Sequence, residues 1–539
     1  MVTKVLAECT QGLPAAVDLA AESLGQRPDV LRVRAGYRVK DGMLTKEPAV
    51  VVVVRQKLPL ATLHQHGTSP LPMHIEGFTL DVANASFKDV LAAASPPDTC
   101  ERGHNYTERT AKKFRLDRFS EPMQAIVHLS PDAGWPNLKQ FLARTEKRLT
   151  VGMYEYSAPH IIEASLELAR RLEAMSLVVQ KGSNIGQGTK AGDIKDAESV
   201  RMLQEAFGDR LEHAWAVLRS AFGRCVNPRG IFDSSYHIKV AVRDRIETWL
   251  SSGSWQSSNQ PPFDPLNNGD QTPPLLSEYN REWHVIIKNE RLANIFEEHL
   301  LQDRRDAEAA AGPDALVDLA DPEMWIANTS LFMERRRPRV PVRYFEPLQI
   351  NRALDIRPVL SPDNYLERAL ELIESATSRD STIYFQNQTF KTAEPRTAGY
   401  TRLLEALLTH QRVGRDVKIL FRYGERDDLE AAQDFGFDIN NIRIDNLCHT
   451  KGIIVDGRVA LLGSHNWSNA GASWNRDASI IFHDEEVAEY LQRVFLYDWS
   501  RARQAELDEY APAPRLVQPW ETSVPAGMIK VRLSQLDLF

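Results

Sequence analysis

The chain has 539 residues, of which 43% are hydrophobic and 26% are charged. This composition is typical of a globular protein, and the length allows for about three domains. The formal net charge of −8 and the isoelectric point near 6.0 argue against a generally basic nucleic-acid-binding protein, although a local basic cleft is compatible with an acidic total. The four cysteines form no CxxC pair, so neither a disulfide framework nor a zinc site is indicated.

The sequence lacks targeting signals. It has no basic-then-apolar stretch of signal-peptide length at its start, and no window approaches the roughly 18 apolar residues that a membrane span needs. We therefore expect a cytoplasmic protein without a transmembrane segment. The sequence does not indicate an oligomeric state.

Residues 1–115 are predicted to form a small α/β domain of unknown role. The segment PAAVDLAAESL has the apolar spacing of an amphipathic helix, and VLRVRAGYRV, AVVVVVRQKL and FTLDVANA are typical of strands. The run AVVVVV is apolar enough for a central strand.

Three landmarks then recur in the same order, which indicates an internal duplication. The first is LSPD, at residues 129–132 and 360–363, each time ahead of a predicted helix. The second is HIKVAVRD from His237 and HTKGIIVD from His449, two apolar stretches that suit buried strands. The third is an Asn-Arg-acid triplet, NRE at 280–282 and NRD at 475–477, each followed by a predicted strand and helix.

These landmarks predict a first repeat at 116–303, a connector at 304–345, a second repeat at 346–510 and a C-terminal tail at 511–539. The first repeat is longer between its landmarks, and we expect two insertions there. One, near 181–228, is predicted to hold the loop GSNIGQGTKAGD and then an amphipathic helix over AESVRMLQEAFGDRLEHAWAVLRSAF. The other is the Pro-, Asn- and Gly-rich SSNQPPFDPLNNGDQTPPLLSEY, which is expected to overhang the active site.

The second copy carries the residues that phosphoryl transfer requires. His449, Lys451 and Asp456 are followed by Ser464 and Asn466. Residues two apart in a strand share a face, so the histidine and the lysine would project into one pocket. Imidazole can attack phosphorus or donate a proton, and a lysine supplies positive charge for the phosphate oxygens. The serine and asparagine would add hydrogen-bond donors for the same oxygens.

The first copy repeats this order at His237, Lys239 and Asp244. Matching the GS pairs of the two copies requires two extra residues in the first copy, and it puts Ser254 and Gln256 at the serine and asparagine positions. Glutamine keeps the amide group on a longer arm, which reaches phosphate after a local shift, or Asn259 contributes in its place. In either case we expect the first copy to remain active.

Both segments resemble the HKD motifs of the phospholipase D superfamily, HxK(x)4D followed by GSxN, and the resemblance covers about residues 120–505. It implies an α/β fold in which two phospholipase D-like repeats form a pseudo-twofold mixed-sheet sandwich with outer helices, beside the small N-terminal α/β domain. It also implies a single site where the two motifs meet, a covalent phosphohistidine intermediate, and no metal or other cofactor.

The resemblance further implies roles for the two histidines. One attacks phosphorus while the other protonates the leaving oxygen and later activates water. We predict His237 as the nucleophile, by analogy with members whose first-copy histidine attacks. The residues expected to stabilise the phosphate charge are Lys239, Lys451, Ser254, Gln256, Ser464 and Asn466.

The acidic residues divide into two predicted groups. A nucleophilic histidine needs its distal ring nitrogen held by an acceptor, and Glu282 and Asp477 are the candidates. Asp244 and Asp456 resemble family residues that brace the structure, and we predict a supporting role for both.

Three functions are compatible with these residues. The first is phospholipase D-type hydrolysis of a phospholipid, or transfer of its phosphatidyl group, with peripheral membrane contact. The second is a cytoplasmic nuclease. It is favoured by the lack of an export signal and by the segment MYEYS, which resembles a strand of nuclease-like family members, and it is disfavoured by the acidic total charge. The third, a decayed binding or scaffold protein, is disfavoured because both histidine-lysine pairs and all the motif acids are present. The sequence favours the phospholipid substrate on charge alone.

Overall fold

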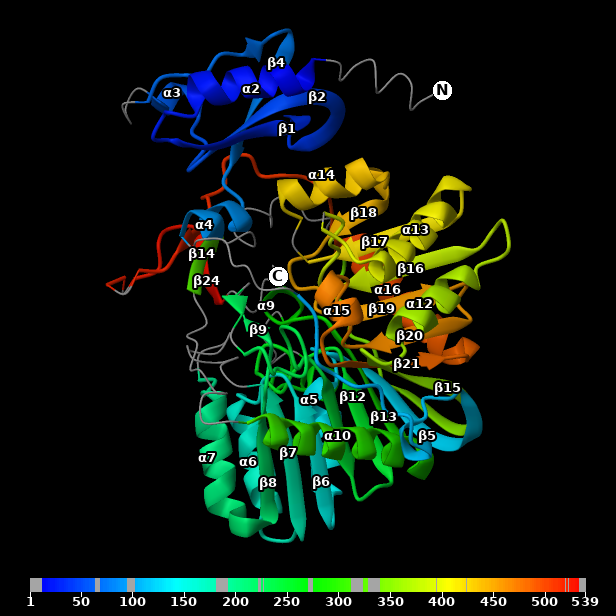
Figure 1. Cartoon of the computed structure of the whole chain (residues 1–539). Helices are drawn as coiled ribbons and strands as arrows, with labels where there is room; N and C mark the ends of the chain where they lie inside the picture. The colour runs from blue at the N-terminus through cyan, green and yellow to red at the C-terminus, as the bar shows by residue number, and fades with distance from the viewer. Residues whose placement is uncertain are drawn as a thin grey trace.

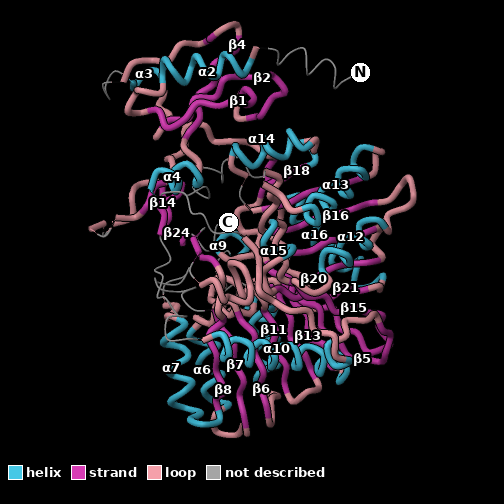
Figure 2. The backbone as a smooth tube through the Cα atoms, in the orientation of Figure 1, coloured by secondary structure: helices cyan, strands magenta, loops and turns pink. Residues whose placement is uncertain are grey.

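The structure is a computed structural model that describes residues 12–63, 68–94, 102–180, 192–221, 224–225, 227–269, 275–311, 323–327, 340–393, 395–422, 424–518, 520–521 and 523–532. Within these ranges the strands form sheets of four, two, fifteen and three strands. Figures 1 and 2 show the largest sheet running through both repeats, with helices along it.

The N-terminal part contains the predicted helix and strands. Its sheet has the strand order β1-β2-β4-β3, and the valine run forms the buried second half of β2, an interior strand as predicted. One face is covered by α2, which packs against this run and thereby forms a small core of its own. The elements are α2 (Leu13–Leu24), β1 (Val30–Lys40), β2 (Met43–Val54), α3 (Leu60–Leu63), β3 (His74–Ile75), β4 (Phe78–Asn84), α4 (Phe87–Ala94) and the 3-10 turn η2 (Lys112–Phe114).

The N-terminal sheet lies against helix α14 of the second repeat (Figure 1). Arg34 of β1 binds Asp427 at 2.7 Å and Glu430 at 2.5 Å, and Arg426 of α14 binds Asp81 at 3.0 Å. Charged contacts therefore dock this sheet on the rest of the molecule.

The first repeat forms one half of the fifteen-stranded sheet, in the order β5-β13-β12-β11-β6-β7-β8. Its elements are β5 (Phe119–Ser130), α5 (Gly134–Ala143), β6 (Arg148–Met153), α6 (Pro159–Leu168), β7 (Ala174–Gln180), α7 (Asp196–Phe207), η3 (Gly208–Arg210), β8 (Leu211–Ala216), β9 (Ser220–Ala221), β10 (Arg224–Cys225), β11 (Lys239–Arg243), β12 (Glu247–Ser251), α8 (Pro265–Asn268), α9 (Leu275–Glu278), β13 (Glu282–Lys288) and α10 (Glu290–Ala310).

The second repeat forms the other half with the matching order β15-β21-β20-β19-β16-β17-β18, and β22 adds an edge strand. Its elements are β15 (Leu348–Ser361), α12 (Tyr365–Glu374), β16 (Thr382–Asn387), α13 (Ala398–Arg412), β17 (Asp416–Phe421), α14 (Arg426–Phe435), η5 (Ile439–Asn441), β18 (Ile442–Ile444), β19 (Lys451–Val455), β20 (Val459–Gly463), α15 (Asn469–Ser473), β21 (Asp477–Phe482), α16 (Glu485–Arg501) and β22 (Arg503–Gln504).

The two half-sheets are joined at one edge and packed across one core. Strands β5 and β15 pair antiparallel, which makes the sheet continuous. Inner-face residues of both halves, such as Val285 and Ile480, belong to one buried cluster, whereas α5 to α7 and α12 to α13 cover the outer faces in separate clusters. Gly452 of β19 lies directly against Trp283 of β13, because a Cβ atom at this glycine would lie 2.1 Å from the tryptophan ring. The pseudo-twofold α/β sandwich of two repeats is therefore confirmed.

The long helix predicted in the first insertion is wrong in its second half. Helix α7 ends at Phe207, and Leu211–Ala216 forms strand β8, parallel to β7. Gly208 has a φ of 57°, a conformation that ends a helix and that glycine adopts without strain. In the second half of β8, the buried Ala214 and Ala216 alternate with the partly exposed His213 and Trp215, which suits a strand covered on one face. Most of the predicted loop GSNIGQGTKAGD lies outside the described residues.

The predicted connector and tail also contain regular structure. Helix α10 continues to Ala310, past the point where the first repeat was predicted to end. Strand β14 (Glu323–Ala327) pairs with β23 (Arg515–Leu516) and β24 (Met528–Arg532) from the predicted tail. Residues 312–322 and 328–339 of the connector lie outside the described residues. Among the residues that are described, no helix combines the length and apolar character that crossing a bilayer requires.

Candidate active site

The two histidine-lysine pairs occupy matching places in the two half-sheets. Lys239 is the first residue of β11, which lies between β12 and β6, and Lys451 is the first residue of β19, which lies between β20 and β16. His237 and His449 precede these lysines by two residues and are buried. Every residue of β11 and β19 is buried, so both faces of each strand are covered. Each motif histidine is therefore held at the end of a well-packed strand.

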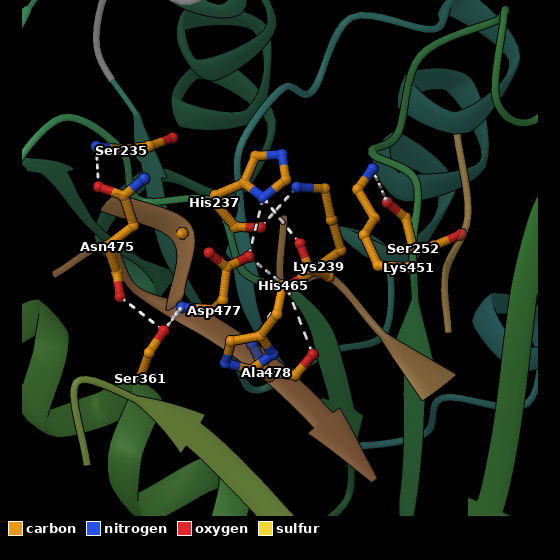
Figure 3. Close-up of polar contacts among 12 residues, drawn as sticks. Ser235, His237, Lys239, Ser252, Ser361, Lys451, His465, Asn475, Asp477 and Ala478 are labelled. Atoms are coloured by element: carbon orange, nitrogen blue, oxygen red, sulfur yellow. Dashed lines mark hydrogen bonds and ion pairs between the residues drawn. The ribbon is translucent and has the colours of Figure 1, made fainter. Parts of the chain in front are cut away.

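His237 is held by the second repeat. Its Nδ1 lies 2.8 Å from Asp477 Oδ1 and 3.1 Å from the backbone oxygen of Ser464 (Figure 3). The Ser464 hydroxyl donates to the same Asp477 oxygen at 2.6 Å. With Nδ1 bound to an acceptor, Nε2 is the ring nitrogen left for chemistry.

His449 is held by the first repeat in the same way. Its Nδ1 lies 2.6 Å from Glu282 Oε1, and the Ser252 hydroxyl donates to Glu282 Oε2 at 2.5 Å. Lys451 Nζ lies 3.2 Å from His449 Nδ1 and donates to the Ser252 carbonyl at 3.1 Å. Each histidine therefore depends on an acid and a serine of the other repeat, so the motifs form one composite site.

Burial shifts the ionisation of the groups in this site. Loss of hydration raises the pKa of Glu282 to about 8 and that of Asp477 to about 6, although the nearby lysines oppose the shift. Burial also lowers the pKa of Lys451 to about 8 and lowers that of Lys239 further below its usual value. The pKa values of both motif histidines are well below the ordinary value, because of burial first and the lysine charges second. A neutral imidazole, the form that can attack phosphorus, is thereby favoured.

The strand registers correct the alignment of the serine motifs. Val240 pairs with Leu250 on β12, and the equivalent Gly452 pairs with Leu462 on β20. Two residues after each leucine come Ser252 and Ser464. Ser252, rather than Ser254, is therefore the equivalent of Ser464, and no extra residues are needed in the first copy. The predicted two-residue insertion is wrong because the letters GS were matched. Ser252, which binds Glu282 as Ser464 binds Asp477, was missed for the same reason.

The corrected alignment also moves Gln256. Ser254 stands at the position of Asn466, and Gln256 lies beyond it. With the Asn259 amide nitrogen facing Glu282, Asn259 donates to the carboxylate at 2.9 Å and accepts from Gln256 Nε2 at 2.9 Å. Gln256 thus contacts a residue that supports Glu282. The phosphate contacts predicted for Ser254, Gln256 and Asn466 stay predictions.

Ser464 donates its single hydroxyl proton to Asp477, so in this structure it orients the carboxylate that holds His237. Its predicted contact with phosphate also stays a prediction. The Asn466 Oδ1 atom is buried, and no hydrogen-bond partner for it is found among the described residues.

The motif aspartates bind backbone amides away from the histidines. Asp244 accepts from the N–H groups of residues 146–148 at 2.7–2.9 Å. Asp456 accepts from Thr382 N at 2.7 Å and Ser381 Oγ at 3.0 Å. Both aspartates have φ near 55°, a left-handed conformation that aspartate tolerates better than most residues. These contacts support the predicted bracing role.

The LSPD and Asn-Arg-acid landmarks bind one another. Arg281 forms a buried ion pair with Asp132 of the first LSPD, and Arg476 binds Asp363 of the second at 2.7 Å. Arg476 also binds Asp303 of α10 at 2.8 Å, so its charge links the two repeats. The arginines directly precede the acids that hold the histidines, and the ion pairs therefore fix the backbone at the site.

Two further side chains near the histidines were absent from the sequence-based site. The Tyr154 ring centroid lies 5.1 Å from that of His237 and 5.1 Å from Lys239 Nζ. Arg422, directly after β17, is among the cations that lower the pKa of His449. In each case the other repeat has a glutamine at the corresponding position, so a search for repeated residues could not find them.

Residues 370–499 match a family model described as the phospholipase D-like domain of cardiolipin synthase. No curated protein sequence matches the chain. The fold is similar to the crystal structure of a phosphatidylserine synthase from Haemophilus influenzae, at 12% identity and a TM-score of 0.46, over 72% of this chain and 90% of that one. It is also similar to Nuc, a phospholipase D family member from Salmonella typhimurium, at 20% identity and a TM-score of 0.23, over 28% of this chain and 97% of Nuc.

The matched segment contains the second histidine-lysine pair, Ser464, Asn466 and Asp477. The first repeat reproduces its strand order and its acid-histidine contact. The second repeat is therefore a phospholipase D-like domain.

Proposed function

We propose that the protein is a metal-independent phosphodiesterase that works through a covalent phosphohistidine. The observation that carries the proposal is the reciprocal arrangement of the two halves. His237 is bound by Asp477 of the second repeat, and His449 is bound by Glu282 of the first. Two imidazoles oriented by acids, with two lysines beside them, supply a nucleophile, a proton donor and positive charge at one place.

The proposed reaction begins with attack of His237 Nε2 on phosphorus. A P–N bond forms and the P–O bond to the leaving group breaks, while the departing oxygen takes the Nε2 proton of His449. A neutral His449 carries that proton when Glu282, whose pKa is raised to about 8, is protonated and donates to its Nδ1. His449 then removes a proton from water, which attacks phosphorus and breaks the P–N bond. Asp477 is suited to the first step, because a carboxylate on Nδ1 stabilises the positive charge that develops on the attacking ring.

We propose a phospholipid as the substrate, with hydrolysis of the head group or transfer of the phosphatidyl group to another alcohol. The description of the family model that matches residues 370–499 names cardiolipin synthase, an enzyme that makes a phospholipid. In addition, the net charge of −8 opposes general binding to nucleic acid. A nuclease is the competing proposal, and a decayed binding protein is the third. Peripheral membrane contact and a cytoplasmic location are part of the lipid proposal.

The purified protein should release head group or phosphatidic acid from mixed phospholipid vesicles in the presence of EDTA. Parallel reactions contain single- and double-stranded DNA and RNA, and His449→Ala serves as the control that removes one motif histidine. Cleavage of nucleic acid without lipid turnover would replace the lipid proposal by the nuclease. No turnover of any of these substrates would favour the binding protein.

The rate should fall on the acid side of about pH 6. The pKa of Asp477 is raised to about 6, so below that pH its carboxylate gains a proton and loses the negative charge that holds His237. Because this pKa is higher in the folded than in the unfolded chain, protonation of Asp477 favours the folded state and does not itself cause unfolding. The dependence of kcat/KM on pH from 4.5 to 9 tests this, with circular dichroism recorded at each pH. An undiminished rate at pH 5 would contradict it.

A further inference from the structure

The two halves of the site differ in how the loop after the serine strand is attached. In the second half, Ser464 is followed by His465, which is fully buried. The His465 ring stacks on Tyr365 with centroids 3.7 Å apart and planes at 6°. Its Nδ1 lies 2.7 Å from the Ser479 hydroxyl. Figure 3 shows His465 on the far side of Asp477 from His237, so it supports the site from behind.

Tyr365 holds the same loop at a second point. Its hydroxyl accepts a hydrogen bond from Trp467 Nε1 at 2.9 Å. The residues on both sides of Asn466 are therefore attached to one tyrosine, the first residue of α12. We call Tyr365, His465 and Trp467 the tyrosine clamp.

At the equivalent positions the first half has neither the tyrosine nor the loop histidine of this clamp. Its loop is held instead by Ser251, whose hydroxyl bonds the Gly253 backbone and lies 2.7 Å from His284 Nδ1. By the strand registers, Gly253 stands at the place of His465, and Trp255 at the place of Trp467. Gly134, the first residue of α5, corresponds to Tyr365 after the LSPD landmark. A Cβ at Gly134 would lie 2.0 Å from Ser130 Oγ, so a tyrosine has no room there. The Trp255 Nε1 atom is buried and has no hydrogen-bond partner among the described residues.

We propose that the tyrosine clamp is a positioning device that fixes His237 for attack. It holds the loop of Ser464, whose carbonyl binds His237 Nδ1 and whose hydroxyl orients Asp477. A nucleophile must keep one geometry toward phosphorus, and misplacement by about 1 Å can cost on the order of 100-fold in rate. His449, which serves first the leaving oxygen and then water, is held by the first-half loop, which has no tyrosine on it. This inference rests on the proposed function.

Two identical substitutions at equivalent places test the clamp. Trp467→Phe removes the indole N–H that binds Tyr365, whereas Trp255→Phe removes one that has no partner among the described residues, and both shrink a buried ring. The measurement is single-turnover release of p-nitrophenolate from bis(p-nitrophenyl) phosphate with enzyme in excess, which reports the attack step. We expect Trp467→Phe to slow release on the order of tenfold and Trp255→Phe to change it less than about twofold. Equal rates would overturn the proposal.

A double-mutant cycle separates positioning from general destabilisation. Tyr365→Phe keeps the stacked ring and removes only the acceptor of the Trp467 hydrogen bond. The double variant should therefore be no slower than the slower single variant, because both remove one bond. Losses that multiply, or losses that follow melting temperature alone across all the variants, would overturn the clamp. If the wild-type protein released no p-nitrophenolate, the proposed function itself would fail. If the wild type were active and the clamp substitutions did not slow it, only the clamp proposal would fail.

Discussion

Replacing His237 by asparagine should abolish the covalent adduct, whereas His449→Asn should let the adduct form and then persist. With bis(p-nitrophenyl) phosphate the leaving group needs little protonation, so attack by His237 survives the loss of His449. Hydrolysis of the P–N bond does not, because no base activates water. The steady-state rate of His449→Asn should fall by about 10²–10⁴-fold, and that of His237→Asn should fall to background.

Intact-protein mass spectrometry under neutral to alkaline conditions detects the adduct, since P–N bonds of this kind are labile to acid. The matched control is His213→Asn, on strand β8 at the far edge of the first half-sheet, which should behave as the wild type. An adduct in His237→Asn and none in His449→Asn would reverse the assignment. Lack of an adduct in all the proteins would argue against covalent catalysis.

The elements that carry the histidines were predictable because they are short apolar strands. HIKVAVRD and HTKGIIVD are buried up to their final aspartates, and the two-residue period within them brings histidine and lysine together. The internal duplication, together with the resemblance to the phospholipase D superfamily, predicted the sandwich of two repeats. The second half of the inserted helix was mispredicted because its apolar residues fit both periods. Contact with β7 and the break at Gly208 favour the strand, and neither is visible in local apolar spacing.

The contacts between landmarks could not be predicted from one sequence. The acids Glu282 and Asp477 were identified, but each holds the histidine of the other repeat, a crossing that only the packed sandwich defines. The serine alignment failed because identical letters were given more weight than spacing. An ungapped alignment through Trp255 and Trp467 would have identified Ser252.

Arg476→Met should destabilise the protein by about 3–5 kcal/mol, because it leaves buried carboxylates without their partner. Arg476 and Asp303 are both fully buried and 2.8 Å apart, and their charges raise the arginine pKa and lower the aspartate pKa. The pair joins the residue that precedes β21 in the second repeat to α10 of the first, so its loss weakens the association of the two halves as well as the fold of each.

Urea unfolding followed by tryptophan fluorescence measures the effect, with Arg352→Met as the control. Arg352 binds Asp484 at 2.5 Å, but its side chain is 43% exposed, so water and salt screen the pair and the expected loss is below about 1 kcal/mol. If the two variants unfolded at the same urea concentration, the buried pair would not be holding the repeats together. A large loss for Arg476→Met alone means that the site is built by the interface, since Asp477, the acid that holds His237, is the next residue in the chain.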